Sequence, residues 1–358
     1  MLVYFGTYTR EASQGIYRSD FDPEAGTLTA PVLAARAANP TFLTTDPGGR
    51  HLYACGELLL EPKPPQAIGG AVAFAIDRAG GALRLLNQEA TGGGNTVHVA
   101  VDATGRTLAI ANYHDGYVAA LPIRGDGRLG PRSAFFSHDG RAPLGPNHKR
   151  QDKAHAHCVI IAPDNRFVLS CDLAQDRVYS YRLDPEQAAL APADPPMAAA
   201  VPGSGPRHGR FSSDGRFLYV ANEMGGTVSQ YAYDAARGHP TLGESYSTLP
   251  EDFSGTNTVG EIRLHPRGRT VYVSNRGHES IAVFARDTAS GRLERIQLIS
   301  CGGKHPRNFE LDPSGRWLLC ANKDTNNVVL FSIDPASGRL TPAGREIAVP
   351  EVTCVLFA

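Results

Sequence analysis

The chain lacks a long apolar run: no stretch approaches the roughly 20 consecutive apolar residues that span a bilayer. Residues 1–9 contain neither a basic segment nor a long apolar segment, so we interpret them as a strand rather than a signal peptide. Charge of one sign is not in excess, because 35 basic residues face 36 acidic ones. No global field therefore favours nucleic acid or anionic lipid, and we expect neither a nucleic-acid nor a membrane partner.

Paired cysteine motifs are also missing, since none of the six cysteines has a C-x-x-C neighbour. We expect small buried thiols in a reducing compartment and place the protein in the cytoplasm. The sequence has no Gly-x-Ser-x-Gly, no Walker loop and no dinucleotide fingerprint, which leaves serine-hydrolase and nucleotide-dependent schemes without support. No group of residues has the spacing of zinc ligands, so we expect no metal and no cofactor.

What the sequence does contain is a repeat. A turn, an arginine and an alternating apolar strand recur six times, with the arginines at Arg50, Arg106, Arg166, Arg216, Arg269 and Arg316. These arginines are separated by roughly 56, 60, 50, 53 and 47 residues, close to the length of a propeller blade. Glycine supplies the positive φ of the preceding turn in five copies, and Asn165 can replace it in the sixth. We interpret the arginines as turn and inter-blade residues.

Each copy continues into a polar turn and a second strand, and such a four-stranded unit cannot bury both of its faces alone. Residues 1–30 resemble the back half of a repeat, and residues 352–357 form a lone strand pattern. Joined in one blade, the two ends would close a ring. The sequence thus predicts one all-β domain over residues 1–358, a seven-bladed β-propeller of four-stranded antiparallel blades closed by the N- and C-terminal strands.

Two segments interrupt this rhythm. The insertion from Leu58 to Gly69 contains three prolines, which exclude a central strand, and a longer polar loop runs from Ser137 to His157. Long polar loops in a compact repeat are more often functional than idle, so we expect both segments to help select a substrate.

Polar residues that the blades do not need occur at matching phases of successive repeats. They are Asn112, His155, His157, Arg207, His208, Glu223, Arg276, Lys304 and Arg307. Equivalent positions in the repeats of a ring lie at the same end of the molecule, so these side chains can converge on the central axis. A histidine can move a proton in either direction near neutral pH, and clustered arginines can bind an anion or a developing oxyanion. The set suits attack on, or formation of, an ester in an anionic substrate.

Each residue also has a structural interpretation. The histidines could cap a strand or bind metal adventitiously, and Glu223 could be a plain surface carboxylate. Arg207 and Arg276 could form ion pairs between blades, and Asn112 could belong to the framework of its strand.

The chain resembles the seven-bladed propeller lactonases, a family that includes bacterial 6-phosphogluconolactonases and fungal carboxymuconate cycloisomerases. The resemblance covers nearly the whole chain and rests on Phe5–Thr9, Asn39–Leu43, Ala111–Tyr113, His155–His157, Gly203–His208, Ala221–Glu223, Val273–Gly277 and Pro306–Phe309. It implies catalysis without a metal by a histidine, a glutamate and two arginines. These correspond to His157, Glu223, Arg207 and Arg276, and we expect His155, Arg307, Asn112, His208 and Lys304 to bind the substrate.

The resemblance implies a lactonase that opens a small anionic sugar lactone, and 6-phosphogluconolactone is the best single candidate. Two alternatives stay open. One is a cycloisomerase that lactonises a muconate-like diacid, since hydrolytic and cyclising members share the same groups. The other is a propeller without enzymatic activity that serves as a protein-binding platform. The sequence leaves the oligomeric state open.

Overall fold

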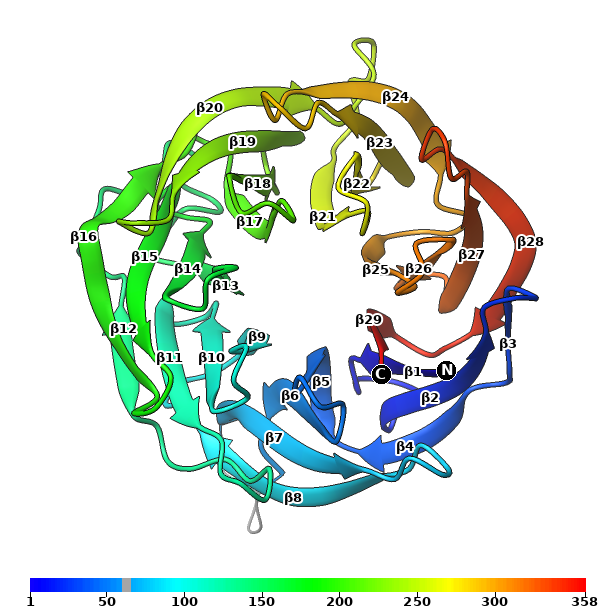
Figure 1. Cartoon of the computed structure of the whole chain (residues 1–358), viewed down its shortest axis with the longest axis horizontal. Helices are drawn as coiled ribbons and strands as arrows, with labels where there is room; N and C mark the ends of the chain where they lie inside the picture. Colours follow the sequence, from blue (N-terminus) through cyan, green and yellow to red (C-terminus); the bar gives the residue numbers. More distant parts are fainter. Residues whose placement is uncertain (60–65) are drawn as a thin grey trace.

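Seven antiparallel sheets stand in a ring around a central axis (Figure 1). The computed structural model describes residues 1–59 and 66–358, and within these ranges every regular element is a β-strand. The predicted all-β, seven-bladed propeller is therefore confirmed. In the part of the chain that the structure describes, no helix has the length and hydropathy needed to cross a membrane.

The innermost strand of each blade faces the axis. These strands are β29 (Val352–Phe357), β5 (Ala38–Thr45), β9 (Thr96–Val101), β13 (Ala156–Ile161), β17 (Pro206–Phe211), β21 (Thr258–Leu264) and β25 (Pro306–Leu311). The second strands are the apolar segments that follow the repeated arginines and their counterpart at the N-terminus. They are β1 (Leu2–Thr7), β6 (His51–Glu57), β10 (Thr107–Asn112), β14 (Phe167–Asp172), β18 (Phe217–Asn222), β22 (Thr270–Arg276) and β26 (Trp317–Asn322).

The third strands are β2 (Gly15–Asp22), β7 (Gly69–Ile76), β11 (Tyr117–Pro122), β15 (Arg177–Asp184), β19 (Thr227–Asp234), β23 (Ser280–Arg286) and β27 (Asn327–Ile333). The outer strands are β3 (Thr27–Leu28), β4 (Val32–Arg36), β8 (Leu83–Ala90), β12 (Ala134–Ser137), β16 (Ala189–Ala199), β20 (His239–Ser247), β24 (Leu293–Ser300) and β28 (Leu340–Ala348). Exposure rises outward, because the inner three strands are covered by neighbouring blades and the outer strands have one side in solvent.

The two ends of the chain close the ring, as predicted. Strand β29 pairs with β1 in antiparallel register, with Val3 opposite Phe357 and Phe5 opposite Val355, and both termini lie in this blade (Figure 1). The outer position of the blade differs from the simple four-stranded pattern, since β3 and β4 share it and both pair with β2. Pro31 lies between them and has no N–H to donate to a continuous ladder.

The hydrophobic core lies between adjacent blades. In one interface Leu218 and Val220 of β18 pack with Leu169 of β14 and Val178 of β15, and all four side chains are fully buried. The closing blade is sealed in the same way, because Val3 and Phe5 join a cluster with Leu319 and Leu330. Burial of both faces of each sheet is what makes the ring stable.

The repeated turns agree with the prediction. Asn165 has a φ of 59°, in the same range as Gly215 at 68°. Several of the repeated arginines reach the neighbouring blade: Arg316 pairs with Glu24 at 2.7 Å, and Arg216 donates to the Thr288 carbonyl at 2.6 Å. The middle of the predicted insertion from Leu58 to Gly69, residues 60–65, lies outside the described residues.

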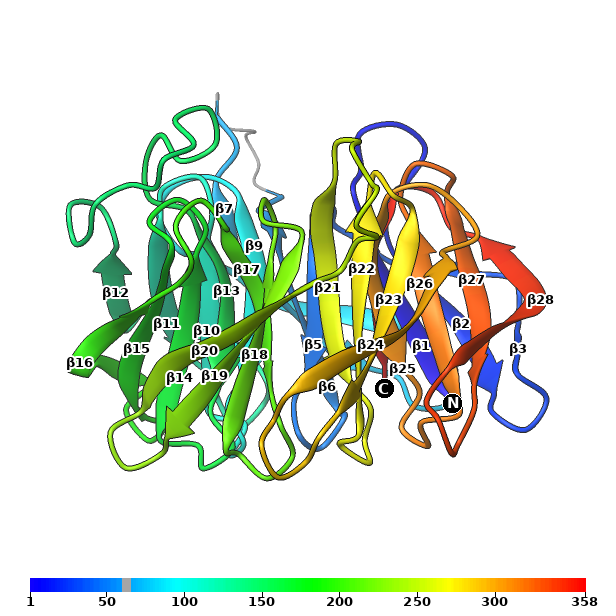
Figure 2. The ribbon, with the colours of Figure 1, turned by 90° about the horizontal axis from the view of Figure 1, so that it is seen from above.

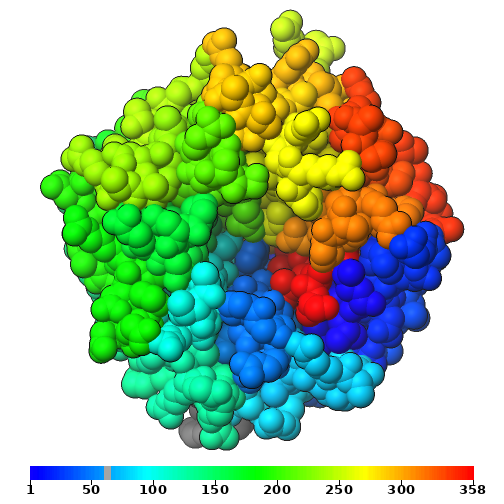
Figure 3. Space-filling model, in the orientation of Figure 1, coloured from blue at the N-terminus to red at the C-terminus, as the bar shows by residue number. Residues whose placement is uncertain are grey.

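The inner strands surround a channel along the axis. The strands stand side by side around it (Figure 2), and the surface is hollowed at the centre of the ring (Figure 3). Two larger cavities lie along this channel. One is lined by residues at or before the beginnings of inner strands and the other by residues toward their ends.

Candidate active site

A cavity of roughly 330 Å³ lies where the inner strands begin. Its walls are formed by Tyr8, Asn95, Val97, Tyr113, Arg150, His157, Glu223, Thr258, Arg276, His305 and Arg307. These residues come from several blades, and all but Arg150 lie where an inner strand begins or where a second strand ends. Four of the nine residues singled out in the sequence line this one cavity, although they lie far apart in the chain: His157, Glu223, Arg276 and Arg307.

Glu223 is the centre of this cluster. It follows β18, and its Oε2 lies 2.9 Å from Nε of Arg207 on β17 and 2.9 Å from Nη2 of Arg276 on β22 of the next blade. Arg150, from the loop between β12 and β13, places Nη2 2.5 Å from Oε1. One carboxylate thus binds three guanidinium groups from three blades. The expected inter-blade ion pair exists between Arg276 and Glu223, and it lines the cavity.

The environment of Glu223 keeps it ionised. Only 4% of the residue is exposed, so the surface-carboxylate interpretation is wrong. Burial alone would raise the pKa of Glu223, but the nearby charges of Arg276 and Arg207 outweigh burial and hold that pKa well below its usual range.

His157 lies beside this carboxylate on β13. Its Nε2 is 3.9 Å from Oε2 of Glu223, and its Nδ1 has no hydrogen-bond partner among the described residues. Burial lowers the pKa of His157 well below that of a free imidazole, and the charge of Arg207 lowers it further. The imidazole is therefore neutral at pH 7 and can accept a proton.

The two matched arginines have different surroundings. Arg276 donates to the carbonyls of Thr258 at 3.3 Å and Val259 at 2.6 Å, and it lines the cavity. Arg207 is only 2% exposed and faces a narrow extension of about 10 Å³ behind the cavity. Burial, followed by the charge of Arg276, lowers the pKa of Arg207 to about 9. Arg207 is thus placed to hold Glu223 rather than to meet solvent.

A buried network supports Arg207 from behind. The Nη1 of Arg207 lies 3.1 Å from Nε2 of His208, and Nδ1 of His208 lies 3.0 Å from Oε2 of Glu261. Asn308 donates to the same oxygen at 2.7 Å. Burial lowers the pKa of His208 to about 3, so His208 is neutral and accepts from Arg207. The predicted substrate contact by His208 is not seen in the main cavity, because this ring faces only the narrow extension.

Three other predicted binding residues lie outside the cavity lining. The Nδ1 of His155 is 2.7 Å from the Tyr113 carbonyl and its Nε2 is 3.0 Å from Asp152, so both nitrogens are occupied. Asn112 is fully buried and its Oδ1 accepts the Asp115 N–H, which makes it a turn residue.

Lys304 is exposed and is the third of these residues. Only its backbone is tied down, through a hydrogen bond of 3.0 Å to the Thr325 hydroxyl. Its position in the repeat is correct, but its side chain is not part of the cavity wall.

Arg307 is the predicted binding residue that does line the cavity. Its guanidinium lies 5.4 Å from the centre of the Tyr8 ring, and no carboxylate pairs with it among the described residues. Tyr8 and Arg150 were not among the predicted site residues. Tyr8 directly follows the second strand β1, the same repeat position as Glu223 after β18, so the repeat contained a signal for it. Arg150 lies in the long polar loop between β12 and β13, which has no counterpart in the other repeats.

Within residues 1–59 and 66–358, no three histidine, cysteine or carboxylate side chains gather in a way that could hold a metal ion. The cavity wall itself offers a neutral imidazole and several guanidinium groups, which are groups that can accept a proton and bind an anion.

Comparison with known proteins gives the same family by three routes. The family model of the seven-bladed β-propeller lactonases matches residues 2–357. The chain is 36% identical over 306 residues to a 6-phosphogluconolactonase of Bacillus subtilis, covering 86% of this chain and 83% of that protein. It is 32% identical over 315 residues to a 6-phosphogluconolactonase of Formosa agariphila, covering 86% of each.

The solved structure of a periplasmic gluconolactonase from Pseudomonas aeruginosa superimposes with a TM-score of 0.92 and 34% identity. The match covers 100% of this chain and 99% of that one. The fold, the family model and the relatives agree, and the chain belongs to the seven-bladed β-propeller lactonase family.

Proposed function

We propose that this protein is a lactonase that hydrolyses 6-phosphogluconolactone to 6-phosphogluconate. The observation that carries the proposal is one cavity in which a neutral imidazole and an ionised carboxylate meet three lining arginines. Such a cavity suits a small anionic ester. Relatives of this chain that are named 6-phosphogluconolactonase support the choice of substrate.

In the proposed reaction His157 is the general base. A water oxygen attacks the lactone carbonyl carbon while its proton passes to the neutral imidazole. The ring C–O bond then breaks, and the imidazolium returns the proton to the departing alkoxide oxygen. Glu223, 3.9 Å from Nε2, stabilises the imidazolium that exists between these two steps.

Each arginine would bind a different negatively charged group of the substrate or the site. Arg276 has donor groups at the cavity wall and would stabilise the oxyanion that develops on the carbonyl oxygen. Arg207 would act one step behind, by orienting the Glu223 carboxylate. Arg307 has no carboxylate partner among the described residues, and with Arg150 it would bind the phosphate.

The test is the rate of 6-phosphogluconolactone hydrolysis above the spontaneous rate. We expect His157→Ala to lower kcat by about 100-fold or more and Arg276→Gln to lower kcat/KM by about 100-fold. Arg307→Gln should mainly raise KM for the phosphorylated lactone and change the unphosphorylated lactone little. His239→Ala, on the outer strand β20, is the matched control.

Equal rates for the wild type, His157→Ala and Arg276→Gln would overturn the proposal. Loss of the conjugated diene of a muconate-type diacid, without lactone hydrolysis, would instead assign the site to cyclisation. We also propose the cytoplasm as the location, on the cysteine pattern, and cell fractionation distinguishes it from the periplasmic location named for the Pseudomonas structure.

A further inference from the structure

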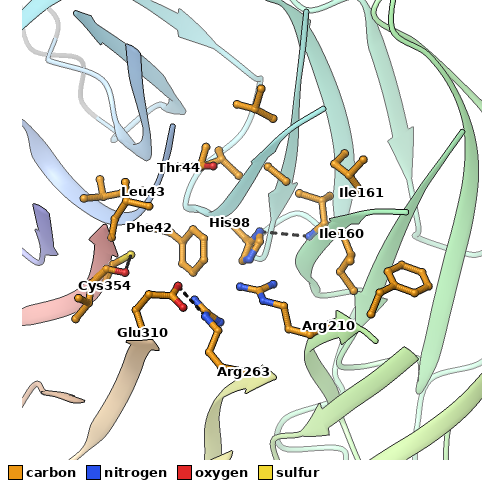
Figure 4. A pocket seen from close by; sticks show the side chains of 17 residues that line it. Phe42, Leu43, Thr44, His98, Ile160, Ile161, Arg210, Arg263, Glu310 and Cys354 are labelled. Atoms are coloured by element: carbon orange, nitrogen blue, oxygen red, sulfur yellow. Dashed lines mark hydrogen bonds and ion pairs between the residues drawn. The ribbon is translucent and has the colours of Figure 1, made fainter. Parts of the chain in front are cut away.

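A second cavity of roughly 320 Å³ lies toward the other end of the central channel (Figure 4). Its walls come from the last residues of the inner strands, among them Val101 of β9, Ile161 of β13 and Phe211 of β17. Because the inner strands all begin at the candidate active site, their ends meet at the opposite side of the channel. Most of the residues that line the cavity are apolar, but charged side chains from β17, β21 and β25 also form part of its surface.

Arg210 is the unusual charged group in this cavity. Its one side-chain hydrogen bond among the described residues is from Nη1 to the carbonyl of the preceding residue, Gly209, at 3.1 Å. No carboxylate lies within ion-pair distance of it in the part of the chain that the structure describes. Figure 4 shows its guanidinium extending from β17 toward Phe42 and His98. A half-buried cation without a direct counter-charge is costly unless something else neutralises it.

The neighbouring Arg263 has the opposite situation. Its Nε lies 2.8 Å from Oε2 of Glu310, and it also pairs with Glu261. The two carboxylates near the cavity are therefore engaged by Arg263. Burial lowers the pKa of Arg210 and the charge of Arg263 lowers it further, whereas the carboxylates beside Arg263 outweigh burial and raise the pKa of Arg263.

A buried imidazole adds a second polar group without a partner. His98 is 2% exposed and lines the cavity, stacked on Phe42 at 4.0 Å between ring centres. Its Nδ1 accepts the Val159 N–H at 3.5 Å, which leaves the hydrogen on Nε2. Nε2 has no hydrogen-bond partner among the described residues.

This cavity is separate from the candidate active site, since the two share no wall residue. The rings of Phe42, His98 and His208 lie between them, with centres 4.0 and 5.1 Å apart along the series. Arg207 and Arg210 are three residues apart on β17, which places their backbones roughly 10 Å apart along the strand.

We propose that this second cavity binds a small monocarboxylate with an apolar body. The carboxylate would form the two parallel hydrogen bonds that a guanidinium offers, on Arg210, and the body would lie against Val101, Ile161 and Phe211. Apolar lining residues with a few convergent polar groups are the usual composition of a small-ligand site, and Arg210 is the lining guanidinium without a carboxylate partner among the described residues. The site does not depend on the lactonase proposal.

Benzoate is the probe and benzamide, its uncharged analogue, is the matched ligand control. Calorimetric titration of the full chain should show benzoate binding at least tenfold more tightly than benzamide. Arg210→Gln should weaken benzoate binding at least tenfold, whereas Arg307→Gln, which removes a guanidinium from the other cavity, should leave it unchanged. Saturating 6-phosphogluconate should not compete.

Equal benzoate affinity of the wild type and Arg210→Gln, or loss of binding in Arg307→Gln, would overturn the proposal. So would competition between 6-phosphogluconate and benzoate. Should Arg210→Gln fail to fold, a crystal of the wild type soaked with benzoate decides, because the proposal requires the carboxylate beside Arg210.

Discussion

Glu223 combines full charge with almost complete burial, and its neighbours explain how. Three guanidinium groups bind its two oxygens, so the carboxylate is not available as a strong base. His157 has the opposite character, since burial and Arg207 keep its imidazole neutral. The division of roles between an ionised carboxylate and a neutral base follows from these environments and not from the residue types alone.

The buried histidines predict how stability depends on pH. Burial lowers the pKa values of His98, His157 and His208 in the folded protein, while in the unfolded chain they return to about 6.5. Below about pH 6.5 the unfolded state therefore binds more protons, and the free energy of unfolding should fall by up to about 1.4 kcal/mol per pH unit for each histidine.

Urea denaturation between pH 7.5 and 5 measures this slope. His98→Gln should lower the slope of unfolding free energy against pH by the contribution of one titrating group. His239→Ala, at a position that is only half buried, should change this slope less. The buried carboxylates Glu223 and Glu261 affect stability at lower pH, because their pKa values are lowered in the folded protein. The stability that they contribute is fully present above their unfolded pKa, and it is lost as the pH falls toward their folded pKa. A slope that is flat between pH 6.5 and 5 would contradict the assignment.

At the scale of single elements, the ends of the second strands carry the framework of the site. Asn112, Asp172 and Asn275 end or nearly end three such strands, and their side chains hold the adjacent turns. Asp172 accepts N–H groups from Ala174 and Gln175, each at 3.0 Å. The residue after such a position lines the cavity at Tyr113, Glu223 and Arg276, whereas Leu173, which follows Asp172, does not. At Asn112 and Asn275 the polar residue at the strand end is therefore structural, and its successor reaches the cavity.

Asn112→Ala tests this division. It leaves the Asp115 N–H without its acceptor at 2.9 Å and should cost about 1–2 kcal/mol of unfolding free energy. Lactone hydrolysis by the folded variant should keep its kcat and KM within about threefold of the wild type, since Asn112 does not line the cavity. A large rise in KM with unchanged stability would return Asn112 to the substrate-binding set.

At the scale of the whole molecule, the ring depends on one pairing between its ends. Strand β29 is the inner strand of the closing blade, and among residues 1–59 and 66–358 its one pairing partner is β1. It also packs against the neighbouring inner strands β5 and β25. Its loss would uncover apolar faces on both sides of one blade, and the axis would lose one of its seven walls.

Truncation after residue 349 is therefore expected to abolish cooperative folding. Thermal melting and size-exclusion chromatography should show loss of the sharp transition and aggregation. The matched control removes Ala358 alone, which is exposed and contributes a single backbone hydrogen bond to Leu2. A truncated chain that melts like the wild type would show that the ring is stable without the closure.

Repeat phase predicted much of the candidate site, because equivalent positions of a ring share one end of the axis. His157, Glu223, Arg276 and Arg307 meet in one cavity as that argument required. Repeat position did not predict the direction in which a side chain points. His155 lies two residues before His157, yet it stacks on Tyr113 at 4.2 Å outside the cavity.

Repeat position could not place residues of loops that occur in one blade alone. Arg150 belongs to a loop with no counterpart in the other blades, so nothing in the pattern showed that it would reach Glu223. Tyr8 differs from Arg150, because it directly follows a second strand, as Glu223 does, and repeat position could have identified it.

The sequence by itself determined the ring, because six alternating repeats and two matching ends can bury their apolar faces only by stacking in a circle. It also determined which polar residues had no part in that stacking. Only the tertiary structure decided which of them share a cavity, which are held behind it and which cap turns. The physical reason is that charge and burial depend on neighbours from other blades, and those neighbours meet only when the circle closes.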